Sequence, residues 1–306
     1  MHFIRLIRPI NLAIIVLTMY GVNFYIHSLS LSLDFNAFDF ALLVFSTVLI
    51  AAAGNIINDY FDIKADRINK PKRMIISKHI KRRWAIVMHW LLSGIAFFIA
   101  GYLSWKYETI WFLVIHTTSI FFLWLYSVKL KKIPLLGNII ISLLTVLVIF
   151  LTLFFTEQVN GFTVFHTQID LALDPLFHIS IKWIIYIFMA MAFFQNLVRE
   201  IVKDIEDIPG DRAIHAKTLP MVIGIRATLL FSGILLILFP LIYFIGIPNY
   251  FPQFDWKLSL PITIAAIFNG IGFLFSLSTQ KLAITSLKII LKSTMLVGLL
   301  YLFLHG

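Results

Sequence analysis

The chain has 306 residues, of which 60% are hydrophobic and only 13% are charged, whereas a typical soluble domain has roughly 25% charged residues. With a mean hydropathy of +0.93, this composition excludes a water-soluble domain and a disordered chain, and it indicates a membrane protein with several spans. The absence of cysteine excludes disulfides, thiolate metal sites and cysteine nucleophiles.

Uncharged stretches of about 20 residues mark the expected transmembrane helices. Eight of them lie, in chain order, at residues 9–29, 38–58, 84–104, 109–128, 135–156, 180–199, 227–246 and 258–279. A ninth, at 285–304, carries Lys288 and Lys292 in its first turns, where long side chains can reach the membrane surface. The sequence therefore predicts an all-α, polytopic membrane protein with about nine transmembrane helices.

The positive charges predict how these helices are oriented. Nine spans place all of the 25 Lys and Arg residues on the side of the N-terminus, except Lys106, Lys182 and Lys257. Cytoplasmic loops are enriched in Lys and Arg, so we expect an integral protein of the cell (inner) membrane with a cytoplasmic N-terminus. Because this topology explains the net charge of +10, no nucleic-acid partner is expected.

Two acidic segments on this cytoplasmic side repeat the same spacing. Asn55, Asp59, Asp62 and Asp66 follow the second span, and Glu200, Asp204, Asp207 and Asp211 follow the sixth, in each case ahead of an arginine. A shift of 145 residues superimposes the two sets and also aligns Lys72 with Lys217. We expect one domain over residues 1–306 that contains two four-helix units, about 9–130 and 135–279, and a final helix at 285–304. Internal repeats of this kind often place a binding site where the units meet.

The spacing predicts a shared face for each set of acids. Offsets of 0, 4, 7 and 11 residues fall within a narrow arc of an α-helix. Clustered carboxylates repel unless a cation neutralises them, and oxygen ligands of this kind suit Mg²⁺. We therefore expect Mg²⁺ at Asp59, Asp62, Asp66, Asp204, Asp207 and Asp211. Pro209 and Gly210 are expected to end the sixth helix before Asp211, which makes the shared face more regular in the first set.

Two facing clusters of this kind can hold the magnesium ions of a diphosphate, because Mg²⁺ usually binds a few carboxylates together with substrate phosphates. Nearby cations would bind the remaining phosphate oxygens. The candidates are Arg67, Lys72, Lys129, Lys203, Arg212 and Lys217. An apolar remainder of the substrate would lie between the helices, which fits a prenyl diphosphate.

The motifs resemble those of the UbiA-type intramembrane prenyltransferases. Asn55-x-x-x-Asp59-x-x-Asp62-x-x-x-Asp66-x-x-Asn69 is similar to the first aspartate-rich motif of that family, and Arg199-Glu200-x-x-Lys203-Asp204-x-Glu206-Asp207-x-x-Gly210-Asp211 is similar to the second. Lys217-Thr218-Leu219-Pro220, Arg8-Pro9-x-Asn11 and Tyr126-Ser127-x-x-Leu130-Lys131 also resemble family segments. The resemblance extends over essentially the whole chain.

The resemblance implies a helical bundle around a central cavity, capped by cytoplasmic loops, and magnesium-dependent transfer of a prenyl group from a polyprenyl diphosphate to an acceptor. It implies that Asn55, Asp59 and Asp62 engage diphosphate and metal from one side, with Asp66 at the edge. Asp204, Asp207 and Asp211 would do so from the other side. Asn11 and Tyr126 are candidate substrate contacts, although polar packing between helices and an interfacial anchor are the alternatives for them.

The residue pattern of the second motif most resembles that of the digeranylgeranylglyceryl phosphate synthase branch, which implies a glycerol phosphate ether as the acceptor. An aromatic acceptor of quinone, haem or chlorophyll synthesis is the alternative. A more distant alternative is an ion transporter with acidic gates, but its acids would be expected near the middle of the membrane. Here they lie at the ends of spans.

Overall fold

The structure is a computed structural model that describes residues 2–28, 33–72, 74–161, 181–250 and 256–304. Among these residues it is α-helical with one 3₁₀ turn, η1 (Leu130–Lys132), and no strand. The long helices are α2 (Pro9–Ser28), α3 (Ala37–Phe61), α5 (Arg82–Lys106), α6 (Trp111–Val128), α7 (Leu136–Asn160), α8 (Ile181–Ala213), α10 (Ile225–Tyr250), α11 (Trp256–Ser276) and α12 (Lys281–Leu304). The all-α prediction is confirmed.

These nine long helices coincide with the nine expected spans, although residues 29 and 180 lie outside the described ranges. Over the described residues, seven are long and apolar enough to cross a membrane, namely α2, α3, α5, α6, α7, α8 and α12. The shorter apolar stretches Ile225–Leu238 and Thr263–Ser276 belong to α10 and α11. The count of nine spans is therefore approximate, whereas the position of each helix is as predicted.

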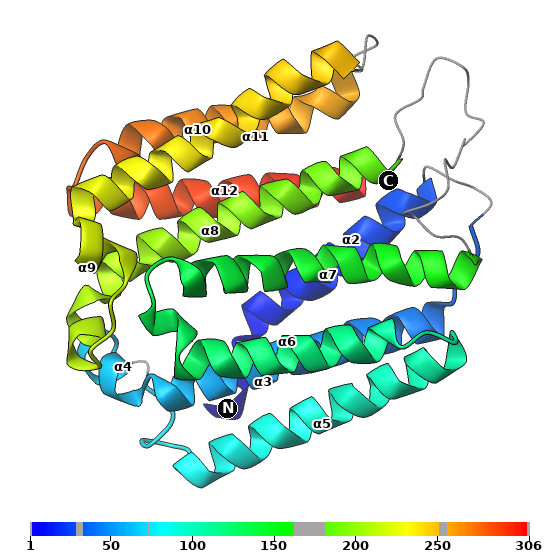
Figure 1. The fold of residues 1–306 in the computed structure, drawn as a ribbon, viewed down its shortest axis with the longest axis horizontal. Helices are drawn as coiled ribbons and strands as arrows, with labels where there is room; N and C mark the ends of the chain where they lie inside the picture. Colours follow the sequence, from blue (N-terminus) through cyan, green and yellow to red (C-terminus); the bar gives the residue numbers. More distant parts are fainter. Residues whose placement is uncertain (1, 29–32, 73, 162–180, 251–255, 305–306) are drawn as a thin grey trace.

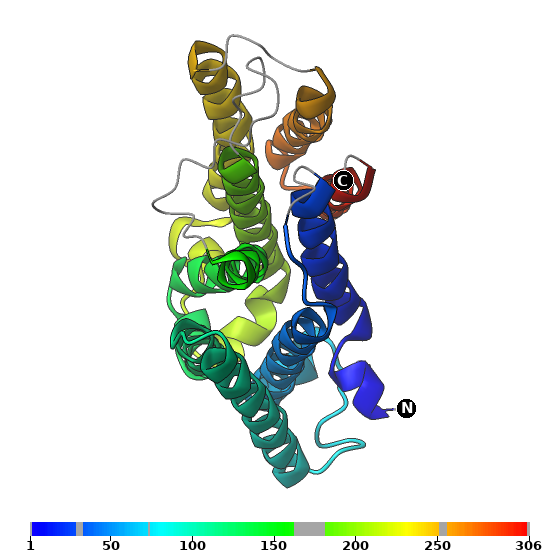
Figure 2. The same cartoon turned by 90° about the vertical axis from the view of Figure 1, so that its right-hand side faces the viewer.

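The long helices form one bundle, and the short helices lie at one end of it (Figure 1). At this end α3 is followed by α4 (Ile63–Asn69), and α8 is followed by α9 (Leu219–Ile223). We call it the acidic end, because both acidic segments lie here. In Figure 2, α10 and α11 lie at one side of the bundle and α5 lies at the other. The helix α1 (His2–Leu6) precedes α2.

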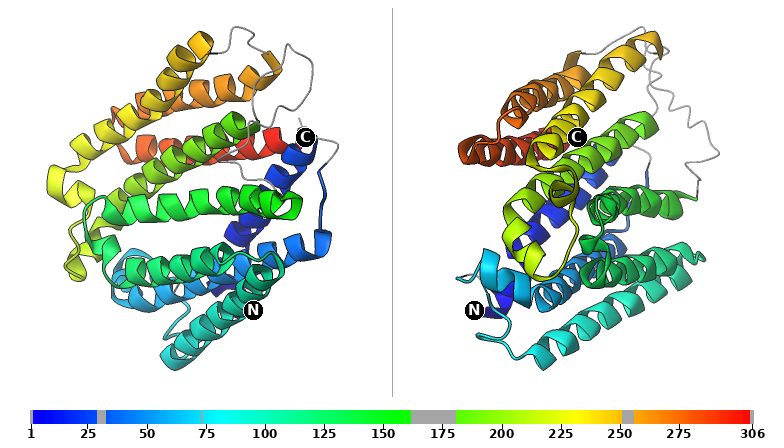
Figure 3. Two further views of the ribbon diagram at one scale, coloured as in Figure 1. Left: turned by 45° about the vertical axis from the view of Figure 1, so that its right-hand side comes forward. Right: turned by 60° about the vertical axis from the view of Figure 1, so that its left-hand side comes forward.

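Contacts between the helices bring distant segments of the chain together. α3 packs on α5 and α6, α7 packs on α8 and α2, and α11 packs on α10 and α12. At the acidic end, α4 packs against the C-terminal part of α8 (Figure 3). This contact joins the two acidic segments, which are separated by about half of the sequence.

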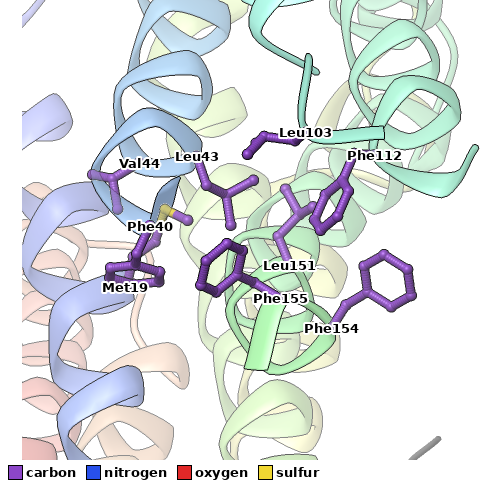
Figure 4. Packing of buried hydrophobic residues seen from close by; sticks show 9 residues of the cluster. All are labelled: Met19, Phe40, Leu43, Val44, Leu103, Phe112, Leu151, Phe154 and Phe155. Carbon is purple, nitrogen blue, oxygen red and sulfur yellow. The ribbon is translucent and has the colours of Figure 1, made fainter. Parts of the chain in front are cut away.

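A cluster of buried apolar side chains lies toward the opposite end of the bundle, between α2, α3, α5, α6 and α7 (Figure 4). Its members are Met19, Phe40, Leu43, Val44, Leu103, Phe112, Leu151, Phe154 and Phe155. The ring of Phe112 meets that of Phe154 edge to face at 5.1 Å between centroids, a favoured geometry for aromatic pairs. This packing fixes the separation of the helices that surround the site.

Candidate active site

A cavity of about 400 Å³ lies at the acidic end, between α3, α4 and α8. Its carboxylates come from both acidic segments: Asp59, Asp62, Asp66, Asp207 and Asp211. We call it the acidic cavity. The tertiary structure therefore brings five of the six predicted metal ligands to one space.

The first acidic segment is divided between two helices. α3 ends at Phe61 and α4 begins at Ile63, with Asp62 between them at φ −83° and ψ 0°. The helical hydrogen bonds continue across this point, because Asp62 N donates to Asn58 O and Asp66 N donates to Asp62 O. Asp59, Asp62 and Asp66 therefore still face the same cavity.

The second segment differs from its prediction, because Pro209 and Gly210 do not end the helix. α8 continues through Pro209 as far as Ala213. The physical reason is tertiary support, because the Asn69 side chain of α4 accepts a hydrogen bond from Gly210 N at 2.8 Å and donates one to Asp207 O at 2.9 Å. The expectation of a more regular face in the first set is also wrong, since the second set lies on one continuous helix.

Cationic side chains already neutralise three of the acids. Arg8 forms an ion pair with Asp59, Lys131 Nζ lies 2.5 Å from Asp62 Oδ1, and Lys70 Nζ lies 2.8 and 3.0 Å from the two oxygens of Asp207. The Asp207 side chain is only 17% exposed, so the charge of Lys70 offsets much of the cost of its burial.

Two further predicted residues are held by neighbouring segments. Asp204 lines neither the acidic cavity nor the apolar cavity described below, and its Oδ2 accepts a hydrogen bond of 2.9 Å from Asn138 of α7. Asn55 donates from Nδ2 to the backbone oxygen of Ile7 at 3.0 Å. That bond ties the residue that follows α1 to α3.

Asp66 lies on α4, outside the spanning helices. Burial, followed by the charges of Asp62 and Asp59, raises the pKa of Asp66 to about 6. A desolvated carboxyl beside two other carboxylates is easier to protonate, because its charged form is poorly solvated and repelled. A bound cation would stabilise the charged form of Asp66 and therefore lower its pKa.

An apolar cavity of about 260 Å³ extends into the bundle between α2, α3, α6, α7 and α8. Asn11, Asn55 and Tyr126 are among its lining residues, and its deeper wall includes Ile15, Val148 and Leu151. Leu151 belongs to the cluster in Figure 4, and Ile15 and Val148 pack against that cluster. The cluster of buried apolar side chains in Figure 4 therefore lies behind the deep wall of this apolar cavity.

The two cavities share Arg8, Asn58 and Lys203 in their linings. Arg8 lies at the junction of α1 and α2 with φ +57°, a left-handed conformation that is uncommon for a residue other than glycine. The restricted Pro9 follows it, and Pro9 begins α2. This backbone geometry places the guanidinium beside Asp59, between a charged space and an apolar one.

Most of the predicted diphosphate-binding cations lie elsewhere. Arg67, Lys72, Lys129, Arg212 and Lys217 are exposed and line neither cavity, whereas Lys203 lines both. Diphosphate binding by these five residues stays a prediction. Among the described residues, the cations that pair with the acids of the cavity are Arg8, Lys70 and Lys131. The signal for two of them was available in the family-like segments Arg8-Pro9-x-Asn11 and Tyr126-Ser127-x-x-Leu130-Lys131.

The donor set of the acidic cavity fits a hard divalent cation, because its side-chain oxygen ligands are carboxylates and the amides of Asn58 and Asn69. Within the part of the chain that the structure describes, no three His, Asp or Glu side chains converge closely enough to hold one metal ion. The pairs above explain this, since Asp59, Asp62 and Asp207 are each directed to a separate cation. A metal shared with a diphosphate would require these pairs to exchange partners.

Comparison with known proteins places the chain in a family. The UbiA prenyltransferase family profile matches residues 15–291. Digeranylgeranylglyceryl phosphate synthase of Methanothermobacter thermautotrophicus is 33% identical over 268 residues, which cover 87% of this chain and 81% of the relative. The enzyme of that name from Methanosarcina mazei is 35% identical over 237 residues, which cover 75% of this chain and 73% of the relative.

Solved structures agree with this result. A structure of digeranylgeranylglyceryl phosphate synthase in membranes matches with a TM-score of 0.68 and 26% identity over 99% of this chain and 97% of that chain. A UbiA homologue from Archaeoglobus fulgidus bound to DMAPP and Mg²⁺ has the same fold, with a TM-score of 0.61 and 15% identity over 99% of both chains. The chain belongs to the UbiA prenyltransferase family and is an integral membrane prenyltransferase.

Proposed function

We propose that this enzyme transfers a geranylgeranyl group from its diphosphate to the free hydroxyl of a glycerol phosphate ether lipid. The observation that carries the proposal is the pair of cavities that share Arg8, Asn58 and Lys203. A diphosphate in the acidic cavity and a prenyl tail in the apolar cavity would meet at these three residues. The bond to be broken would then lie beside two cationic side chains.

Magnesium is the cation that we assign to the acidic cavity. Asp59, Asp62, Asp66, Asp207 and Asp211 would hold it, with Asp204 oriented by Asn138 at the edge. When bound, the metal supplies positive charge that stabilises the departing diphosphate. The UbiA homologue from Archaeoglobus fulgidus binds Mg²⁺ together with DMAPP, and in a second structure together with GPP, which supports this assignment.

The residues of the chain itself would perform three tasks. Arg8, Lys70 and Lys131 neutralise the acids and can turn toward the phosphate oxygens as these enter, because a charge-assisted hydrogen bond to phosphate is of similar strength. Asn58 and Lys203 would orient the diphosphate at the boundary of the two cavities. The apolar cavity would enclose the prenyl tail and keep water from the allylic carbon at its mouth, which protects a cationic transition state from hydrolysis.

We also propose an orientation of the protein in the membrane and a division of the bundle into two repeat units. We place the acidic end at the cytoplasmic face of the cell membrane, because nearly all Lys and Arg residues lie on that side of the predicted topology. We assign the first repeat unit to α2–α6 and the second to α7–α11. In each unit the acidic segment begins in the C-terminal part of the second long helix, α3 in the first unit and α8 in the second.

The acceptor is assigned from the relatives, because both synthases compared above are named for a glyceryl phosphate product. The test uses the purified protein in detergent with Mg²⁺ and radiolabelled geranylgeranyl diphosphate. Geranylgeranylglyceryl phosphate is compared with hydroxybenzoate-type and naphthoate-type rings as acceptors. We expect an ether product with the glycerol lipid that disappears when Mg²⁺ is chelated.

Product only with a ring would overturn the acceptor and keep the prenyl transfer. Absence of transfer to any acceptor, with the donor bound, would overturn the proposed donor–acceptor pair. Ion flux through sealed vesicles, without a chemical product, would favour the transporter alternative.

A further inference from the structure

A single amide side chain makes two hydrogen bonds across the contact between α4 and α8. Asn69 is the last residue of α4. Its Nδ2 donates to the backbone oxygen of Asp207 at 2.9 Å, and its Oδ1 accepts from the backbone nitrogen of Gly210 at 2.8 Å. One side chain thus holds two backbone groups of a helix that lies 138 and 141 residues further along the chain. We call these two hydrogen bonds the amide clamp.

The clamp lies where α8 is intrinsically weak. Pro209 has no N–H group, so this turn of α8 lacks one intrahelical hydrogen bond, and a proline ring inside a helix also crowds the preceding turn. Such a turn is expected to bend or to end unless neighbouring groups support it. Asn69 bonds to backbone groups on both sides of Pro209, so it supports the turn that carries Asp207 and Asp211.

The two helices approach too closely for any side chain at Gly210. A Cβ atom at this position would lie 2.4 Å from Asn69 Nδ2 and 2.7 Å from the backbone oxygen of Ala65. Glycine is therefore required here by close approach rather than by its backbone angles. Because Asn69 and Ala65 already contact Gly210 this closely, α4 and α8 have little freedom to shift relative to each other.

The clamp stands between the two sets of carboxylates. Asp66 lies three residues before Asn69, and Asp211 follows Gly210 directly. Both acids line the acidic cavity. The next residue, Lys70, donates to both carboxylate oxygens of Asp207. Asn69 thus holds the backbone of the second acidic segment against α4, and the neighbouring Lys70 neutralises the Asp207 carboxylate of that segment.

We propose that Asn69 is a positioning residue that sets the distance between the two acidic sets, and thereby the affinity for magnesium and diphosphate. Its side-chain oxygen and nitrogen both bond to the backbone of α8, so it would act through the carboxylates of Asp66, Asp207 and Asp211. This inference rests on the proposed metal–diphosphate role of the acidic cavity. Groups that orient the ligands of a metal typically change metal affinity by about 10–100-fold when they are removed.

The chain offers a matched control for the purely structural effect of losing a clamp. Asn160, at the end of α7, makes the same two bonds with the backbone of Asp34. Its Oδ1 accepts from Asp34 N at 2.8 Å and its Nδ2 donates to Asp34 O at 3.2 Å. This second clamp lies at the end of the bundle away from the acids. Asn160→Ala therefore removes two equivalent hydrogen bonds, together with one of 2.9 Å from Asn160 Nδ2 to Thr156 O within α7, without affecting the acidic cavity.

The kinetic experiment compares wild type, Asn69→Ala and Asn160→Ala. We expect Asn69→Ala to raise the half-saturating Mg²⁺ concentration and the KM for geranylgeranyl diphosphate by about tenfold, with the KM of the acceptor unchanged. Asn160→Ala should keep all three values. Equal Mg²⁺ dependence in Asn69→Ala and Asn160→Ala would overturn the positioning role.

A second measurement tests the geometry without catalysis. The protein has no cysteine, so nitroxide labels can be attached at Lys64→Cys on α4 and Ala213→Cys on α8, both at exposed positions. We expect Asn69→Ala to broaden the distance distribution between the labels and Asn160→Ala to leave it narrow. Unchanged distances with Asn69→Ala would overturn the inference, even if the enzyme were inactive for another reason. Broadened distances in a protein that does not bind Mg²⁺ would instead contradict the proposed function.

Discussion

Ala65 and Gly210 hold the same position in the two acidic repeats, and the structure places them against each other. They are 145 residues apart, and a Cβ at Gly210 would come within 2.7 Å of the backbone oxygen of Ala65. Each precedes the last aspartate of its set. The two acidic segments therefore meet at their smallest residues, which allows carboxylates on both sides to face one cavity.

The first prediction concerns this close approach. Gly210→Ala should separate α4 from α8, lower the thermal stability in detergent and reduce prenyl transfer, because the new methyl group would overlap Asn69 and Ala65. Gly101→Ala on α5 is the control, since no atom lies within 4 Å of a Cβ there. It should keep its activity and melt at or above the temperature of wild type. Similar melting curves and rates for both variants would contradict the packing argument.

The second prediction concerns the charge of the acidic cavity. Asp62→Asn and Asp207→Asn should each reduce the initial rate of prenyl transfer by about 100-fold or more, while the protein still inserts and folds. Glu206→Gln is the matched control, because Glu206 lies beside Asp207 but is exposed and pairs with Lys288 of α12. Full activity in both aspartate variants would refute the metal assignment.

The third prediction follows from Asp66. Because burial and the neighbouring acids raise the pKa of Asp66 from 3.8 to about 6, the folded protein binds more protons than the unfolded chain between these values. Its contribution to the stability of the metal-free protein therefore decreases as pH rises from about 4 to 6. Melting temperatures of wild type and Asp66→Asn, measured without metal across this range, should differ in slope. As pH rises, only the wild type should lose the stability that the protonated Asp66 contributes, because the asparagine side chain of the variant Asp66→Asn does not titrate.

The same titration should govern metal binding. Mg²⁺ requires the deprotonated carboxylate, so the apparent Mg²⁺ affinity of wild type should rise as pH increases through about 6, and Asp66→Asn should reduce this rise. Identical pH profiles for the two proteins would show that Asp66 does not take part in metal binding.

The fourth prediction separates stability from catalysis. At the other end of α3, the fully buried Asp39 accepts a hydrogen bond of 2.7 Å from Tyr107 and pairs with Lys106 at 2.6 Å. Asp39→Asn should lower the free energy of unfolding by about 1–3 kcal/mol, because charge-assisted bonds to a buried group are lost. Asp34→Asn, at a nearby exposed position, should have little effect. The KM values of Asp39→Asn should stay unchanged, since it lies about 30 Å along the helix from Asp59.

The helices could be predicted because their cause is local. In a membrane every backbone polar group must be satisfied within its own segment, so an apolar run of sufficient length already specifies a helix. A long helix lies at each of the nine expected segments, over the residues that the structure describes. The acids could also be found from the sequence, because the spacing of Asp59, Asp62 and Asp66 returns at Asp204, Asp207 and Asp211.

The tertiary structure decided which cations pair with these acids. Arg8, Lys70 and Lys131 neutralise the carboxylates, whereas the equally basic Arg67, Lys129 and Arg212 stay exposed. All six residues carry the same charge, so charge does not distinguish the two groups, whereas the packing of α1, α4 and the turn η1 does. The continuation of α8 through Pro209 has the same origin, because the hydrogen bonds that support it come from Asn69, far away in the sequence. A local pattern specifies a helix, but a bond between distant segments exists only once the chain has folded.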